Sequence, residues 1–370
     1  MSGEVLRVTY DLTPRPEEDP HDKAKGVALE QSAELPSRCI PEHVYDDVVP
    51  RIEALTPLGD GRYRLVLDFP EAITGHEPTQ LINNLYGNIS LKSGIRLAHV
   101  EWTDSLLRTL GGPRFGVQGV RDLLGAGERP LSSTALKPLG LDTATLAGYC
   151  ADFARGGIDL IKDDHGLCDQ ATSRYAERLH ACQQAVEEVN AQTGRRSLYL
   201  PNVTAPRWEL GHRLEAAQEA GCRAVLICPF ITGLDALIWA RERFDLALMA
   251  HPAYAGAVAG AEHGIDPALL LGEITRLFGA DMVVYTNAEG RFPTYDQALC
   301  DRINDRLWRP LGDIRPALPT PGGGVDAERA PYWAERYGPD VVLLIGGSLY
   351  AQGDRVAAAR QLQAIVEGAG

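Results

Sequence analysis

Short apolar runs alternate with longer amphipathic runs over the last two thirds of the chain. Eight runs rich in aliphatic residues are predicted as strands, at residues 134–138, 158–163, 197–201, 224–229, 246–251, 282–286, 317–320 and 341–345. Apolar residues that recur every three or four positions predict helices between them, among them 143–154, 173–193, 212–220, 234–243, 267–278 and 355–367. Eight alternating units in about 235 residues predict an α/β fold, a (β/α)8 TIM barrel of parallel strands. A doubly wound open sheet is the alternative, although it seldom supplies eight evenly spaced units.

The first part of the chain has a different pattern. Segments 5–12 and 61–69 alternate apolar and polar residues, as half-buried antiparallel strands do, and segment 23–32 has the pattern of a helix. We therefore expect a smaller N-terminal α+β (ferredoxin-like) domain over residues 1–120 and the barrel over 121–370. Gly and Pro mark candidate linkers at 111–116 and 125–130.

Composition and charge exclude several classes of protein. The 370 residues carry 36 Lys and Arg against 50 Asp and Glu, a net charge of −14 without any basic run, so no nucleic-acid partner is expected. No apolar stretch approaches the roughly 20 residues that span a bilayer, and no signal-peptide pattern is present, which predicts a cytoplasmic protein without a membrane partner. The seven cysteines form no CxxC pair and are interpreted as reduced core residues.

In a TIM barrel the carboxyl ends of the strands converge on the active site, so polar residues at these ends are candidates for chemistry. In chain order they are Lys137; Lys162, Asp163, Asp164 and His165; Asn202 and Thr204; His251; Asn287, Glu289 and Arg291; Gly322, Gly323 and Gly324; and Gly346, Gly347 and Ser348.

The group at the end of the second strand is the most informative. Because alternate side chains of a strand share a face, Lys162 and Asp164 are predicted to point into the barrel mouth and Asp163 away from it. The pattern fits a metal or acid/base site, and equally an ion pair at a strand end. Lys137 is a second candidate, because an amine beside another amine has a lowered pKa and can then act as a base near neutral pH. The alternative is a salt bridge between Lys137 and Asp164.

Glycine runs follow the seventh and eighth strands, in PTPGGGV and LLIGGSL. Barrels commonly bind phosphate at these two ends through free backbone N–H groups, and two runs favour phosphate binding over simple tight turns. His251 is a single histidine at a strand end and fits a structural role as well as a catalytic one.

These segments resemble those of the RuBisCO superfamily. GGIDLIKDDHGLCDQ is similar to the family's metal-site segment, in which a glycine pair and an apolar strand lead into Lys-x-Asp-Glu. PRFGVQGVRDLLGAGERPLSSTALKPLGL resembles the segment that leads into the first barrel strand. NNLYGNISL and ALEQS resemble N-terminal segments that carry an asparagine and a glutamate, here Asn88 and Glu30. The order of the segments over nearly the whole chain identifies a member of this family.

The departures from the family pattern indicate a RuBisCO-like protein of the form IV group. His165 replaces the metal-binding glutamate, Pro252 replaces an arginine of the carboxylases, Arg291 replaces the mobile-loop lysine, and the strand-six histidine is absent. The losses at Pro252 and strand six remove groups for a second phosphate, which implies a monophosphorylated substrate. Loss of the loop lysine removes the charge that stabilises a developing carboxylate, so CO2 fixation is not expected.

The resemblance implies enolate chemistry, in which a metal polarises a ketone and a lysine-derived base moves the α-proton. The leading candidate is an isomerase of 5-methylthioribulose 1-phosphate in methionine salvage. The alternatives are decarboxylation or transcarboxylation of a sugar-acid phosphate, a diketo-phosphate enolase, and a non-catalytic protein that binds a phosphorylated ligand.

The resemblance also implies roles for individual residues. Catalytic roles are expected for Lys137, Lys162, His165 and His251. Carbamylated Lys162, Asp164 and His165 would bind Mg2+, although imidazole suits manganese, iron or zinc better, and His165 would otherwise be a proton shuttle. The expected substrate and phosphate contacts are Glu30, Asn88, Arg291, Gly322, Gly323, Gly324, Gly346 and Gly347. Glu30 and Asn88 would reach the site of a neighbouring subunit, which implies a homodimer with interface active sites.

Overall fold

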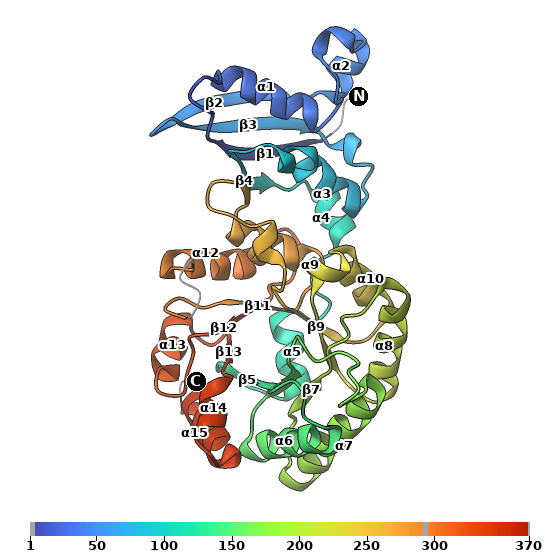
Figure 1. Cartoon of the computed structure of the whole chain (residues 1–370), viewed down its shortest axis with the longest axis vertical. Coiled ribbons are helices and arrows are strands. Elements are labelled where there is room, and N and C mark those ends of the chain that lie inside the picture. The colour runs from blue at the N-terminus through green and yellow to red at the C-terminus, as the bar shows by residue number, and fades with distance from the viewer. Residues whose placement is uncertain (1–3, 291–294, 369–370) are drawn as a thin grey trace. The chain divides into compact units, whose positions relative to one another are not determined.

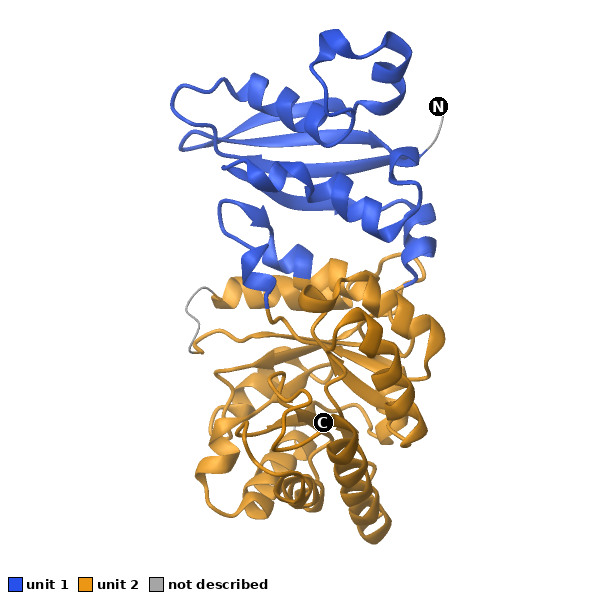
Figure 2. Ribbon diagram, turned by 45° about the vertical axis from the view of Figure 1, so that its right-hand side comes forward, with its two compact units in different colours: residues 1–111, 254–270 blue, residues 112–253, 271–370 orange. Residues whose placement is uncertain are grey.

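The computed structural model describes residues 4–290 and 295–368, and its chain forms two compact units (Figures 1 and 2). Unit 1 comprises Met1–Gly111 and Tyr254–Leu270, and unit 2 comprises Gly112–Ala253 and Leu271–Gly370. The boundary expected at residue 120 therefore lies at Gly111, because the next helix packs in the barrel core. Tyr254–Leu270, expected in the barrel domain, belongs instead to unit 1, where its short strand joins the sheet.

Unit 1 is built on a five-stranded sheet with the order β10-β4-β1-β3-β2. Its strands are β1 (Val5–Leu12), β2 (Arg51–Gly59), β3 (Arg62–Pro70), β4 (Ile95–Glu101) and β10 (Gly264–Ile265), and its α-helices are α1 (Pro20–Glu30), α2 (Glu42–Val48), α3 (Pro78–Tyr86) and α4 (Asp104–Leu110). The pairs β1–β3, β1–β4 and β2–β3 are antiparallel, with α1 and α3 as the crossovers. This order confirms the ferredoxin-like prediction.

The local sequence explains where these elements lie. Alternate residues of β1 are buried, as the apolar–polar alternation predicts. The first helix begins at Pro20, three residues before the prediction, because the Asp19 side chain accepts hydrogen bonds from the backbone N–H groups of His21 and Asp22.

Unit 2 is a closed eight-stranded parallel barrel. Its strands are β5 (Leu131–Leu136), β6 (Leu160–Asp163), β7 (Leu198–Leu200), β8 (Ala224–Ile227), β9 (Ala247–Ala250), β11 (Met282–Thr286), β12 (Leu318–Gly322) and β13 (Val342–Leu344). The ladder runs β7-β6-β5-β13-β12-β11-β9-β8, and the barrel closes where Val203 N–H donates to Leu226 O and Leu226 N–H donates to Pro201 O, each at 2.9 Å. The predicted TIM barrel is confirmed, and the open-sheet alternative is wrong.

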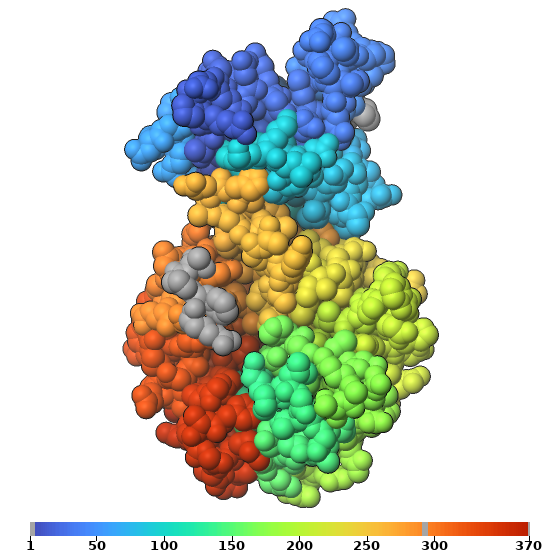
Figure 3. Space-filling model, viewed as in Figure 1, coloured from blue at the N-terminus to red at the C-terminus, as the bar shows by residue number. Residues whose placement is uncertain are grey.

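Helices surround the barrel, as predicted. They are α6 (Thr143–Gly156), α7 (Tyr175–Thr193), α8 (Arg207–Glu219), α9 (Pro229–Thr232), α10 (Asp235–Arg243), α11 (Thr275–Leu277) after a π-helical segment (Ala268–Ile274), α12 (Gln297–Trp308), α13 (Ala330–Tyr337), α14 (Gly347–Ala351) and α15 (Arg355–Gly368). A further helix, α5 (Gly116–Leu124), lies at one end of the barrel. The last long helix lies beside the first crossover helix (Figure 3), where Arg355 binds Asp152 at 2.7 Å and Gly156 leaves room for Ala359. This contact completes the helical ring.

One end of the barrel is filled by α5. Its Val117, Val120 and Leu124 pack with barrel-facing residues such as Leu131 and Leu160. The buried carboxylate of Asp281 accepts hydrogen bonds from the N–H groups of Phe115, Gly116 and Leu248 at 2.7–2.8 Å. The opposite end, where the strands finish, is therefore the candidate position for an active site.

No helix among the described residues combines the length and apolar character needed to cross a membrane.

Candidate active site at the barrel mouth

The strand-end side chains of the barrel follow the predicted alternation. Leu160 faces the barrel core, and Lys162, two residues further along β6, is 2% exposed and donates to the carbonyl of Asp163 at 3.0 Å. Asp163 points the other way and binds Arg178 of α7 at 3.1 Å. Lys162 and Asp164 therefore lie on the mouth side and Asp163 outside the barrel, which confirms this part of the interpretation.

Four polar side chains from three strand ends meet at the mouth. Lys137 Nζ lies 2.7 Å from Asp164 Oδ1, and His165 Nδ1 lies 3.6 Å from the same oxygen. The rings of His165 and His251 stack with centroids 4.1 Å apart and planes 15° apart. The ion pair that was the alternative interpretation of Lys137 is present, and it forms part of a larger cluster.

Electrostatics in this cluster follow from burial and from the proximity of the two amines. Burial is the main reason that the pKa of Lys162 falls to about 8; Lys137 lowers it further, and Asp164 opposes the shift. Burial would raise the pKa of Asp164, but His165, Lys137 and Lys162 outweigh it and hold that pKa well below its usual value. Asp164 is therefore an anion and Lys162 has an accessible neutral form near neutral pH.

His251 is held in one tautomer when it is neutral. Burial, together with Lys162 and His165, keeps the pKa of His251 well below its usual value. Its Nδ1 accepts a hydrogen bond from Ala253 N–H at 3.2 Å, so the proton of the neutral ring is on Nε2. Nε2 can then donate to a ligand oxygen.

Buried polar groups hold the segment that carries Asp164 and His165. Asn202, another strand-end candidate, donates through Nδ2 to His165 O at 3.0 Å and to Leu167 O at 2.8 Å. Asp163 accepts from Tyr199 OH at 2.8 Å as well as from Arg178. The backbone at the end of β6 is therefore fixed from two sides.

The two glycine runs follow adjacent strands, because Gly322 of β12 pairs with Leu344 of β13. Gly323 and Gly324 have left-handed φ angles of 71° and 128°, and a Cβ on Gly324 would lie 2.6 Å from Gly290. A side chain at Gly323 or Gly324 would therefore be strained.

Backbone N–H groups in the glycine runs are available to bind a ligand. Within the described residues, no hydrogen bond is donated by the N–H groups of Gly323, Gly324 or Gly346. A Cβ on Gly346 or Gly347 would meet open space. Arg291 lies outside the described residues.

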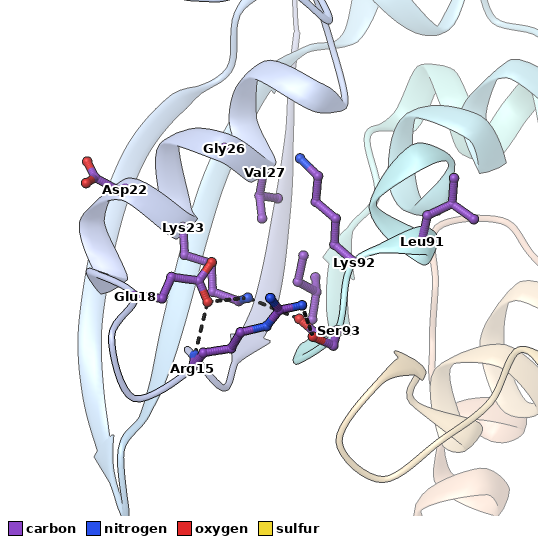
Figure 4. A pocket seen from close by; sticks show the side chains of 10 residues that line it. Arg15, Glu18, Asp22, Lys23, Gly26, Val27, Leu91, Lys92 and Ser93 are labelled. Atoms are coloured by element: carbon purple, nitrogen blue, oxygen red, sulfur yellow. Dashed lines mark hydrogen bonds and ion pairs between the residues drawn. The ribbon is translucent and has the colours of Figure 1, made fainter.

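The two N-terminal candidates come together in unit 1. Asn88 Nδ2 donates to Glu30 Oε1 at 3.3 Å, and Lys92 Nζ lies 2.6 Å from Glu30 Oε2. The hydrogen bond from Lys92 is the main reason that the pKa of Glu30 lies below its usual value. Lys92 also borders an open cavity of about 420 Å³ beside α1, lined by Arg15, Lys23 and Ser93 among others, as Figure 4 shows; neither Glu30 nor Asn88 lines it.

Sequence reasoning missed three residues of these clusters. Lys92 is one. Tyr350 accepts from Lys137 N–H at 3.0 Å and donates to Ala135 O at 2.8 Å, which fixes the end of β5. Cys228, taken as a core residue, lies near enough to Lys162 and Asp164 for both charges to act on its thiol. Cys228 could have been identified from the sequence, because it lies two residues after Leu226, which faces the barrel, and alternate residues of a strand share a face. The sequence offers no comparable signal for Tyr350.

The donor set at the mouth fits a metal only if Lys162 is modified. Among the described residues, no group of three or more His, Cys, Asp and Glu side chains is arranged to hold a metal ion. Asp164 and His165 offer one carboxylate and one imidazole, and a carbamate on Lys162 would add a second oxygen ligand beside them. The accessible neutral form of Lys162 is compatible with this, because a neutral amine is the form that reacts with CO2.

Comparison with known proteins agrees with this architecture. Residues 116–368 match one protein family, described as ribulose bisphosphate carboxylase large chain, catalytic domain. Ribulose bisphosphate carboxylase-like protein 1 of Rhodopseudomonas palustris is 39% identical over 358 residues, covering 96% of this chain and 95% of that protein. The 5-methylthioribulose-1-phosphate isomerase of Rhodospirillum rubrum is 38% identical over 339 residues, covering 90% and 88%.

A solved structure gives the same result. The crystal structure of a RuBisCO-like protein from Rhodopseudomonas palustris has a TM-score of 0.90 to this chain at 38% identity, covering 100% of this chain and 99% of that one. The chain therefore belongs to the RuBisCO large-chain family and, within it, to the RuBisCO-like proteins.

Proposed function

We propose that this chain is an isomerase that moves a proton next to the ketone of a monophosphorylated keto-sugar, with 5-methylthioribulose 1-phosphate as the leading substrate. The observation that carries the proposal is the cluster of Lys137, Lys162 and Asp164 with two histidines at the mouth of a barrel whose last two strands end in glycine runs. The similarity to an isomerase of this substrate supports the same reaction. CO2 fixation is not part of the proposal.

Lys137 is the proposed acid/base group. Its amine lies at the mouth, where its side chain is 39% exposed, and Asp164 holds it by one oxygen at 2.7 Å. Proton transfer needs a donor and acceptor within hydrogen-bond reach, and a tethered amine meets this requirement for a ketose bound across the mouth. His251 would donate from Nε2 to a substrate hydroxyl, with His165 stacked on its ring.

Carbamylated Lys162, Asp164 and His165 are the proposed ligands of Mg2+ or of another divalent metal. The bound metal would polarise the substrate carbonyl and stabilise the enolate oxygen. If Lys162 is not carbamylated, its buried amine is a second candidate base. His165 would then be free to shuttle protons between neighbouring groups.

The glycine runs are the proposed phosphate site, and this leads to a prediction. Gly347→Ala is expected to change the unfolding free energy by less than about 0.5 kcal/mol, because its Cβ meets open space. The methyl group would hinder a phosphate at the backbone and weaken a hydrogen bond worth about 1.5–3 kcal/mol, raising KM about tenfold or more.

Steady-state kinetics and urea denaturation would measure both effects of Gly347→Ala. Gly148→Ala is the matched control for KM, since Gly148 also has open space around it but lies within α6, away from the glycine runs. An unchanged KM in the Gly347 variant would contradict a phosphate site at this turn.

We further propose a cytoplasmic homodimer in which Glu30 and Asn88 of one subunit contact the substrate of the other. Both side chains are at least partly accessible and are held next to each other in unit 1. A cytoplasmic location suits a phosphorylated substrate, because its charge hinders passage through a membrane.

Proton NMR in deuterium oxide tests the reaction. With 5-methylthioribulose 1-phosphate, Mg2+ and bicarbonate, we expect deuterium to enter the carbons next to the ketone and an isomer to accumulate. EDTA is expected to stop exchange, and removal of bicarbonate is expected to slow it if a carbamate is needed.

Other outcomes would contradict the isomerase proposal. An inert substrate with every divalent metal tested would exclude it. CO2 release from a sugar-acid phosphate would favour decarboxylation, and turnover of a diketo phosphate alone would favour an enolase. Binding without exchange would favour a non-catalytic protein.

A further inference from the structure

We propose that Gln31 is a positioning residue, whose buried side chain sets the geometry of Glu30 and Asn88. The inference rests on the proposed function, in which these two residues contact the substrate. Gln31 follows Glu30 at the C-terminal end of α1, and it is only 4% exposed although its side chain is polar. Such a buried amide must satisfy its hydrogen bonds within the protein.

Every polar atom of the Gln31 side chain has a partner. Nε2 donates to Asn83 O at 2.8 Å and to Asn84 O at 2.7 Å, both at the end of α3. Oε1 accepts from Ile89 N–H at 3.1 Å. In return, Asn84 Nδ2 donates to the backbone carbonyl of Gln31 at 3.2 Å. One side chain therefore joins the end of α1 to the end of α3 and to the turn that follows it.

These bonds lie next to both substrate-contact candidates. Glu30 directly precedes Gln31, and Asn88 directly precedes Ile89, although the two segments are 58 residues apart in the chain. The direct bond between Asn88 and Glu30 is exposed and long, at 3.3 Å, so it holds the pair weakly. Lys92 Nζ also binds Glu30 Oε2 at 2.6 Å, but this ion pair is exposed as well, so the buried amide is the contact that fixes their spacing.

A second contact holds the same turn from another side. His263 Nε2 donates to Ser90 O at 3.1 Å, since a carbonyl can only accept. Tyr86 OH holds the chain around His263 in place, because it accepts a hydrogen bond from Gly264 N–H at 2.7 Å. Because the turn has this independent anchor, loss of the Gln31 amide is expected to loosen and shift Asn88 without unfolding unit 1.

Gln31→Met tests the inference, because methionine keeps the length of the side chain and removes its polar atoms. We expect kcat/KM for the isomerisation to fall about 10- to 100-fold, as small misplacements of contact groups do. Amide hydrogen exchange at Ile89 is expected to quicken, while barrel amides stay unchanged. The matched control is Ser32→Ala, since Ser32 follows α1 and its Oγ bonds only to carbonyls of that helix, and it should leave both quantities as in the wild type.

A double variant separates positioning from general stability. If Gln31 acts through Asn88, then Gln31→Met should lower kcat/KM far less in an Asn88→Ala background than in the wild type. If the two substitutions lower kcat/KM in a fully additive way, or if amide exchange at Ile89 is unchanged in an active Gln31→Met enzyme, the positioning role of Gln31 is overturned and the proposed function stands. A folded wild type that is inert toward the substrate would overturn the proposed function, and with it the catalytic part of this inference.

Discussion

Replacing Lys137 by methionine is expected to lower kcat about 10²- to 10⁴-fold, the usual contribution of a general acid or base. The amine is 2.7 Å from Asp164 in a pair that is partly open to solvent, so its loss should affect stability little. The measurement is deuterium incorporation next to the ketone, followed by NMR, with substrate affinity measured separately by calorimetry. Exchange should be lost while binding is largely kept.

Two further variants separate proton transfer from charge. Lys137→Arg preserves a cation beside Asp164, but a guanidinium stays protonated and cannot act as a base. It should therefore be nearly as inactive as Lys137→Met. Lys25→Met removes an exposed lysine from α1 and should have no effect. Wild-type exchange in Lys137→Arg would show that only the charge matters and would remove Lys137 from the acid/base role.

The parts of the site that follow strand periodicity could be predicted from the sequence. Lys162 and Asp164 share a face because side chains alternate along a strand, and this requires no knowledge of the neighbouring strands. The closed barrel also followed from the count of strands. The phosphate role of the glycine runs stays a prediction, although the runs do follow neighbouring strands.

Features that depend on contacts between distant segments could not be predicted. The first barrel strand begins at Leu131, three residues before its predicted start. The prediction missed this start because Ser132 and Ser133 are polar, yet both are buried, and Ser132 bonds to Asp159 and Gln363. The short strand β10 lies between two barrel elements in the sequence but joins the sheet of unit 1 through β4. Neither arrangement leaves a local pattern in the sequence.

The stacking of the two histidines could not be predicted for the same reason, because it depends on contacts between distant segments. His165 and His251 come from the ends of β6 and β9, which are not adjacent in the barrel, and their stacking depends on the loop after β6. That loop is shaped by Asn202 and Arg178, which donate to its backbone carbonyls, His165 O and Cys168 O. Backbone acceptors exist at every position, so the residue types do not reveal them.

Breaking the buried ion pair beneath the site is expected to destabilise unit 2 strongly. Arg178 and Asp163 have fully buried side chains, and Arg178 also donates to Ser173 O at 2.8 Å and to Cys168 O at 2.7 Å. Arg178→Met would leave the Asp163 carboxylate buried without a counter-charge. We expect it to lower the unfolding free energy by about 3–5 kcal/mol, measured by urea denaturation.

Comparison with two other variants decides whether the buried charge is the cause. Arg174→Met removes a neighbouring arginine whose pair with Asp169 is about half exposed, and it should cost less than about 1 kcal/mol. Adding Asp163→Asn to Arg178→Met removes the unpaired charge, so the double variant should be more stable than Arg178→Met alone. If it is no more stable, the loss in Arg178→Met comes from the unpaired carbonyls of Ser173 and Cys168 and not from the buried charge. In either case the loop that carries Asp164 and His165 loses its anchor, so exchange next to the ketone should fall along with stability.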